Sequence, residues 1–140
     1  MALGNTQDVL VGIPDSSGGL WVADLIEDTA LLPGADDDLA TAGFVPAGFI
    51  GEDGVTEAND RDTDKIKAWG GDTVRVIQND HTITYSFTFL ELGNAEVLKL
   101  IYGEENVEVA DDQITVKKNS QVLPHKTWVI EVFDKGADRK

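Results

Sequence analysis

Hydrophobic and polar residues alternate most regularly in residues 81–92. In an extended chain, successive side chains point to opposite sides. One side would carry Thr82, Thr84, Ser86 and Thr88, and the other Ile83, Tyr85, Phe87 and Phe89. This alternation predicts a strand with one packed face and one polar face. Residues 71–78 are expected to form the preceding strand, with Asn79 and Asp80 as a two-residue hairpin turn, because both residue types tolerate a left-handed backbone.

A helical period follows this strand. Gly93 breaks the strand, Asn94 is a suitable N-cap, and Gly103 is a suitable terminator. Between them, apolar residues recur at spacings of three and four, which predicts a helix that packs by one face: Val97, Leu98, Ile101 and Tyr102. A hairpin followed by one short helix is therefore the expected nucleus of the fold.

The remaining elements are expected to be short. Alternating apolar residues predict an N-terminal hairpin from strands at 9–13 and 20–26. Pro46 cannot donate to a sheet ladder, so a strand at 44–50 should lie at an edge or a bulge. Residues 27–43 lack a period and are expected to form a surface loop, with one helical turn near 39–42. Further strands are expected at 107–109, 114–117 and 128–133, and residues 134–140 should be frayed.

These elements predict one mainly β domain over residues 1–140. We expect a small β-sandwich or a partly open β-barrel with one packed α-helix and long loops. Residues 52–69 are extended but mostly polar, so they should form a charged arm rather than part of the core. Trp69 lies in this charged, glycine-containing stretch and is expected outside the core. Six other aromatic residues are expected in the core: Trp21, Tyr85, Phe87, Phe89, Trp128 and Phe133.

Charge changes this picture more than size does. The chain has 140 residues, no cysteine and a formal net charge of −15. Residues 1–70 hold 14 acids against 3 bases, so the charge is concentrated in the first half. Such a surface repels phosphate and disfavours nucleic-acid binding through a basic footprint. Acidity alone is also explained by solubility. No apolar run has the length of a membrane span and no signal peptide is recognisable, so a soluble protein made in the cytoplasm is expected.

No pattern of catalytic residues stands out. Asp60, Asp62 and Asp64 have the first three spacings of a calcium loop, but Lys65 and Gly71 occupy the positions that need glycine and glutamate. Phosphate-binding glycine motifs are absent, and no serine has a nucleophile-elbow context. His81 and His125 are expected to be exposed. The sequence therefore indicates neither an enzyme nor a cofactor or metal site.

Four segments in a fixed order resemble a known family. They are EDGVTE, DRDTDKIKAWGGD, FTFLEL and NAEVLKLIYG, within residues 44–133, and KIKAWGGD at 65–72 is the most specific. This order is similar to the major tail protein of long-tailed bacteriophages with non-contractile tails. The resemblance implies a tail-tube-like fold and a structural virion protein. Its subunits would form rings, usually hexameric, that stack into the tail tube through which the genome passes.

The resemblance also implies partners and contact residues. The partners would be further copies of the chain, a tape-measure protein and a tail terminator, while double-stranded DNA would pass without specific binding and the chain would bind no membrane. The hairpin would line the channel through Thr82, Thr84, Ser86 and Thr88. The charged arm would make subunit contacts through Glu52, Asp53, Asp60, Arg61, Asp62, Asp64, Lys65, Lys67 and Trp69.

The chain differs from this family in one respect, and three other functions compete with the one that the resemblance implies. Tail tube subunits usually continue with further strands after the one corresponding to residues 127–133, whereas this chain stops. The chain could be a shortened form, an unusually small subunit, or one completed by a neighbour's strand. The rivals are a monomeric β-sandwich binding module with an aromatic-lined cleft, a tail terminator or head decoration subunit, and an enzyme.

Overall fold

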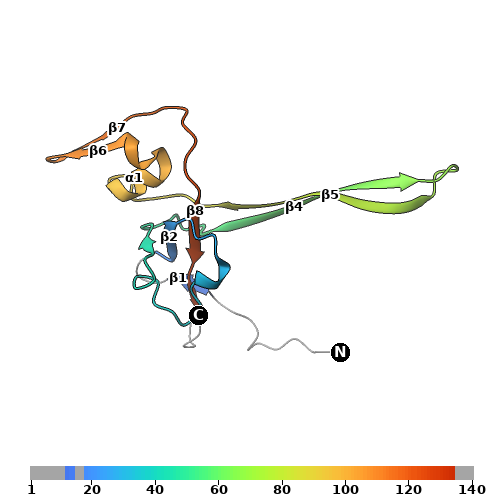
Figure 1. Cartoon of the computed structure of the whole chain (residues 1–140), viewed down its shortest axis with the longest axis horizontal. Coiled ribbons are helices and arrows are strands. Elements are labelled where there is room, and N and C mark those ends of the chain that lie inside the picture. Colours follow the sequence, from blue (N-terminus) through green and yellow to red (C-terminus); the bar gives the residue numbers. More distant parts are fainter. Residues whose placement is uncertain (1–11, 15–17, 135–140) are drawn as a thin grey trace. The chain divides into compact units, whose positions relative to one another are not determined.

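The computed structural model describes residues 12–14 and 18–134, and this part of the chain is mainly β, as predicted. It contains nine strands, one α-helix and two short 3-10 helices (Figure 1). The strands form four small sheets, and the described residues close no barrel. The chain divides into two compact units, which we call the hairpin unit (Gly51–Thr88) and the core unit (Met1–Ile50 with Phe89–Lys140). A single domain over the whole chain stays a prediction.

The core unit contains a three-stranded sheet in the order β3 (Val45–Pro46), β2 (Leu20–Asp24), β8 (Lys126–Ile130). Leu20 and Val22 alternate along β2 and are both buried, at 1% and 6% exposure. β3 lies at the edge, as Pro46 predicted. The predicted N-terminal hairpin is wrong, because β2 pairs with β3 and β8.

A second small sheet pairs the two ends of the described chain. β1 (Gly12–Pro14) is antiparallel to β9 (Val132–Asp134), and residues 9–11 of the predicted first strand lie outside the described residues. The strand predicted at 128–133 is therefore divided between two sheets at Glu131, whose backbone N–H donates to the Gly19 carbonyl at 2.7 Å. Gly19 has φ +78°, and a Cβ there would lie 2.8 Å from the Pro14 Cβ, so only glycine fits. The predicted frayed tail began at Asp134, which is instead the last residue of β9, and residues 135–140 lie outside the described residues.

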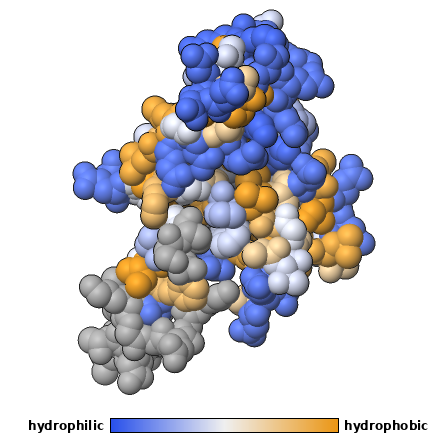
Figure 2. Space-filling model, turned by 90° about the vertical axis from the view of Figure 1, so that its left-hand side faces the viewer, coloured by the Kyte–Doolittle hydropathy of each residue, from blue (hydrophilic) through white to orange (hydrophobic). Residues whose placement is uncertain are grey.

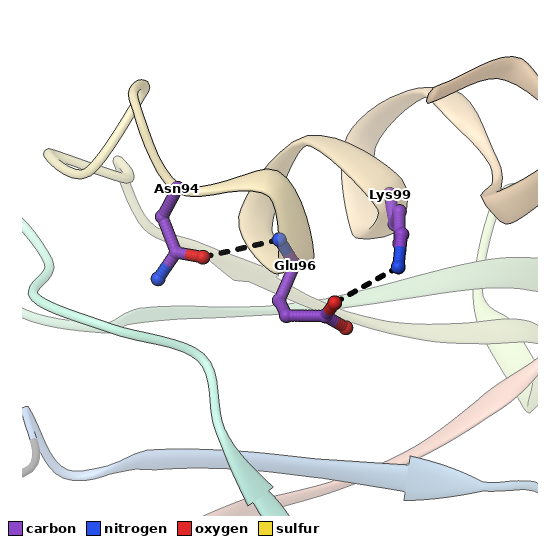
Figure 3. A network of polar contacts seen from close by, with 3 residues as sticks. All are labelled: Asn94, Glu96 and Lys99. Atoms are coloured by element: carbon purple, nitrogen blue, oxygen red, sulfur yellow. Dashed lines mark hydrogen bonds and ion pairs between the residues drawn. The ribbon is translucent and has the colours of Figure 1, made fainter. Parts of the chain in front are cut away.

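Helix α1 (Ala95–Tyr102) begins and ends as predicted. The Asn94 side chain accepts a hydrogen bond from the Glu96 backbone N–H at 3.1 Å (Figure 3). One turn later the Lys99 ammonium pairs with the Glu96 carboxylate at 2.9 Å. Gly103 ends the helix with φ +98°, and its N–H donates to the Lys99 carbonyl. Local capping chemistry therefore fixes both boundaries.

The helix packs on the segment that follows it. Its neighbours are η3 (Glu104–Asn106), β6 (Val107–Ala110) and β7 (Gln113–Val116), so the short strands predicted near 107–109 and 114–117 are present. Val97 of the helix and Val107 of β6 are buried. Asn106 is also buried, and its amide donates to the Tyr102 carbonyl at 2.7 Å, which ties η3 to the helix end.

Residues 27–43 form a loop with a defined backbone. It contains η2 (Thr29–Leu31), where the Asp28 carboxylate accepts from the Ala30 N–H at 2.9 Å. The expected helical turn near 39–42 is a turn closed by a 3.0 Å bond from the Ala42 N–H to the Asp38 carbonyl. Leu39 is buried, so the loop also contributes to the core.

All buried side chains of the described residues lie in the core unit. Patches of apolar residues nevertheless reach the surface in Figure 2. None of the six aromatic residues predicted for the core is buried: Tyr85 and Trp128 are 51% and 40% exposed, and the other four are partly exposed. The nucleus was predicted to be a hairpin followed by one short helix. This is wrong for the hairpin, which buries no side chain, whereas the helix contributes Val97 to the core. The apolar core contains Leu20, Val22, Leu39, Phe44, Ala47, Val97 and Val107.

Candidate functional site

The hairpin unit is a long two-stranded ribbon (green, Figure 1). β4 (Thr56–Lys67) has 12 residues and pairs antiparallel with β5 (Thr73–Ser86), which has 14. Every residue of both strands is exposed. A two-stranded ribbon is at best marginally stable on its own in water. We therefore expect another molecule to pair with the ribbon or to cover it.

The turn of this hairpin lies at residues 68–72, so the predicted turn at Asn79 and Asp80 is wrong. Gly70 and Gly71 have φ values of +109° and +96°, which glycine adopts without strain. The Ala68 N–H donates to the Asp72 carbonyl at 2.8 Å and closes the turn. Asn79 instead lies at a register shift opposite Asp62 and Thr63. The predicted charged arm is consequently one strand of the hairpin.

One side of the ribbon, which we call the acidic face, collects carboxylates and hydroxyls. Cross-strand partners share a face, so the register assigns the side of each residue. Four acids and one base lie here, and Ile66, Arg75 and Ile77 occupy the end nearest the turn. The members are Thr56, Ala58, Asp60, Asp62, Asp64 and Ile66 of β4, and Arg75, Ile77, Asp80, Thr82, Thr84 and Ser86 of β5.

The opposite side, which we call the basic face, has three bases and one acid. It also exposes Val76, Ile83 and Tyr85, at 56%, 46% and 51%. The two faces of one ribbon therefore differ in the sign of their charge. The members are Glu57, Asn59, Arg61, Thr63, Lys65 and Lys67 of β4, and Thr73, Val76, Gln78, His81, Ile83 and Tyr85 of β5.

Side-chain contacts within each face support this assignment. On the acidic face, Thr82 Oγ1 donates to Asp80 Oδ2 at 3.4 Å. On the basic face, His81 Nε2 and Asn59 Oδ1 lie 2.8 Å apart. There a hydrogen bond to Glu57, together with its negative charge, raises the pKa of Tyr85.

The structure divides the predicted contact residues between the two faces. Asp60, Asp62 and Asp64 lie on the acidic face, whereas Arg61, Lys65 and Lys67 lie on the basic face. Trp69 is fully exposed in the turn, as expected for a residue outside the core. Glu52 and Asp53 lie in the turn from Gly51 to Gly54, outside both strands.

Three of the four predicted channel residues, Thr82, Thr84 and Ser86, share the acidic face. Thr88 lies beyond β5, and its carbonyl accepts from the Gly51 N–H at 2.8 Å. The expectation that Ile83 and Tyr85 would pack is wrong within this chain. The sequence signal for two faces was the period-two alternation of acids at 60, 62 and 64 with bases at 61, 65 and 67.

The other candidate sites in the described residues offer little support for a metal or ligand site. Within residues 12–14 and 18–134, no group of three His, Cys, Asp or Glu side chains is placed to hold a metal ion. Two clefts lie in the core unit, one around Val45 and Leu100 and one around Val122 and Leu123, and no aromatic residue lines either one. They do not fit the aromatic-lined cleft of a carbohydrate-binding module. In the same described part, no helix is long and apolar enough to cross a membrane.

A family model decides among the remaining possibilities. The model described as "Phage tail tube protein" matches residues 4–139. The chain belongs to this family. The resemblance to a phage tail protein is therefore confirmed. No curated protein and no solved structure matches the chain.

Membership of the phage tail tube family determines the class of function. The protein is a structural protein of the tail tube and a component of the virion. The family implies assembly with other tail subunits. This class favours a tube subunit over a monomeric binding module.

Proposed function

We propose that copies of this chain associate through β4 and β5 into rings that stack into the tail tube. The observation that carries the proposal is the ribbon itself, since its 12 and 14 strand residues are all exposed. Each strand is paired on one side only within the described residues. The unpaired backbone groups of an edge strand are a template for pairing with another chain.

The ring would close through a head-to-tail contact. The free edge of β4 in one copy would pair with the free edge of β5 in the next. If the rotation between neighbours closes the ring, no copy is left with an unpaired strand edge. Six copies are proposed from the usual symmetry of the family. A second contact that does not close by rotation would stack the rings into a tube.

The acidic face would line the channel. Its four carboxylates repel DNA phosphates, and Thr82, Thr84 and Ser86 offer neutral hydroxyls. Double-stranded DNA would then pass to the host without being held by the wall. A tape-measure protein would occupy the channel before the DNA, and a tail terminator would end the tube.

Electron microscopy and mass in solution test this proposal. The purified protein is concentrated at neutral pH and moderate salt, and class averages of end-on views give the ring symmetry. Rings or hollow tubes are expected, with a central opening. Monomers alone, both for the purified chain and after co-expression with the other tail proteins, would overturn the proposal.

A further inference from the structure

The basic face has no partner within its own ribbon that would neutralise it. The ion pairs found among the described residues involve Lys99, Lys117 and Lys126, and none involves a base of the hairpin. Val76, Ile83 and Tyr85 lie exposed beside Arg61, Lys65 and Lys67. Mixed basic and apolar surface of this kind fits an acidic partner that also offers apolar side chains.

Residues 27–38, which we call the acidic loop, have that composition. Residues 104–112 also hold five acids, but Glu108 there is already paired with Lys117 at 2.6 Å. The acidic loop contains Glu27, Asp28, Asp36, Asp37 and Asp38, and residues 18–50 contain no Lys or Arg. Leu31 and Leu32, between these acids, are 71% and 44% exposed. The acidic loop thus has the opposite charge to the basic face, and both surfaces expose apolar side chains.

The acidic loop is also held in one conformation. Asp37 Oδ2 accepts from the Gly34 N–H at 2.7 Å, and Asp38 Oδ2 accepts from the Thr41 hydroxyl at 2.8 Å. The Asp28 carboxylate caps η2. A surface that is already ordered loses less conformational entropy on binding.

We propose that the basic face docks on the acidic loop of a second copy of this chain. The inference rests on the proposed tube assembly and adds which surfaces of two subunits meet. Exposed ion pairs add little affinity, so the charges mainly orient the contact and speed the encounter. Burial of Leu31 and Leu32 against Val76, which lies opposite Lys65, supplies the main attraction.

A charge swap tests whether the two surfaces meet. The hairpin variant carries R61E, K65E and K67E, which face His81, Val76 and Thr73 and therefore create no acidic cross-strand pair. The loop variant carries E27K and D36K, two loop acids whose side chains accept no backbone bond in the loop, unlike Asp28, Asp37 and Asp38. Circular dichroism checks that both variants keep the wild-type fold.

The hairpin variant alone is expected to lose sedimenting assemblies, because like charges then meet. The loop variant alone is expected to form fewer of them, because its loop keeps three acids against two new lysines and attracts the basic face much less. Mixing the two variants should recover part of the assembly, since the acidic hairpin of one copy then meets a loop with far less negative charge, and the basic hairpin of the other meets an intact acidic loop. Assembly of either variant at the wild-type level would overturn the inference. So would restoration only when both sets of changes are in one chain, which would place the contact within a subunit.

Cross-linking provides a readout that does not depend on tube formation. The chain has no cysteine, so Lys65→Cys in one copy and Asp36→Cys in another supply the only thiols. A short bismaleimide is expected to join the two chains into a dimer. Asp64→Cys is the matched control. Asp64 directly precedes Lys65 in β4 but lies on the acidic face, so a thiol there should cross-link much less.

These outcomes separate the inference from the proposed function. Dimers without rings would uphold the docking contact and contradict the tube, whereas rings without dimers would overturn the contact alone. Equal cross-linking by Lys65→Cys and Asp64→Cys would also overturn it. A hairpin variant that assembles normally but loses affinity for double-stranded DNA would assign the basic face to nucleic acid instead.

Discussion

Asp62 and Asp80 lie directly opposite each other across β4 and β5, on the acidic face. Like charges in this position destabilise a strand pair. Asp64 follows on the same side, where its Oδ2 accepts from Asn79 Nδ2 at 2.7 Å. In an isolated ribbon this concentration of charge only costs stability. Facing a channel that conducts DNA, the same carboxylates would keep phosphates away from the wall.

Asp80→Asn should stabilise the ribbon. The substitution removes the repulsion from Asp62 but keeps an oxygen that can accept from the His81 N–H, as Asp80 Oδ1 does at 2.8 Å. The free energy of local opening should rise by about 0.2–1 kcal/mol. Slower amide hydrogen exchange in β4 and β5 would report it. Asp72→Asn in the turn, opposite no acid, is the control and should change the exchange less.

Trp69→Ala should separate assembly from folding. The side chain is fully exposed, so its loss should change the free energy of unfolding by no more than about 0.5 kcal/mol. Buried aromatic residues often dominate interfaces, and assembly should therefore weaken. The emission of Trp69, obtained as wild type minus variant, should shift to shorter wavelength when subunits assemble. A normal yield of assemblies from the variant would show that the turn makes no contact.

Asn94→Ala should destabilise the core unit by about 0.5–2 kcal/mol, the usual range for loss of an N-cap. The Asn94 side chain accepts from the Glu96 N–H and donates to Glu91 Oε2 at 2.9 Å. Thermal or denaturant unfolding measures the change. Asn94→Ser keeps a capping oxygen and should recover most of the loss. Equal destabilisation by both variants would mean that the cap contributes little.

Stability should fall as acid protonates Glu91. Its carboxylate accepts from the Asn94 side chain and from the Phe49 N–H, and these bonds lower the pKa of Glu91 below its ordinary value of 4.5. A lowered pKa in the folded state adds stability above the unfolded pKa and loses it as pH falls through the folded one. Unfolding measured at a series of acidic pH values should therefore depend less on pH in Glu91→Gln. An unchanged pH dependence would contradict this role.

Replacement of residues 54–86 by a short glycine linker should leave a folded core unit. The hairpin unit buries no side chain, and the Ile50–Phe89 bridge lies outside the replaced segment. The thermal midpoint should change little, while rings and tubes should disappear. Tubes of normal length from this variant would contradict the assignment of the ribbon to assembly. A variant of unchanged length, with Gly70 and Gly71 replaced by alanine, would show separately what the turn geometry contributes.

The sequence predicted best where local chemistry decides. Asn94 and Gly103 fixed both ends of α1 because caps satisfy backbone groups within a few residues. The hairpin was misplaced because Asn79 and Asp80 resemble a turn, whereas Gly70 and Gly71 form it. The division of one predicted strand into β8 and β9 depends on partners about a hundred residues away, which no local pattern reports. Apolar residues of an exposed face look like core residues until the register is known.

The alternation of side chains along β4 has a consequence for how this protein can evolve. One residue gained or lost within the strand would move every following side chain to the other face. Asp64 and Lys65 would then exchange places, and the ribbon would present the wrong sign of charge on both sides. Related proteins should therefore differ in the length of this strand by an even number of residues, or by one residue where a new bulge absorbs it. The parity of strand length, rather than the identity of any one residue, would be the trait under selection.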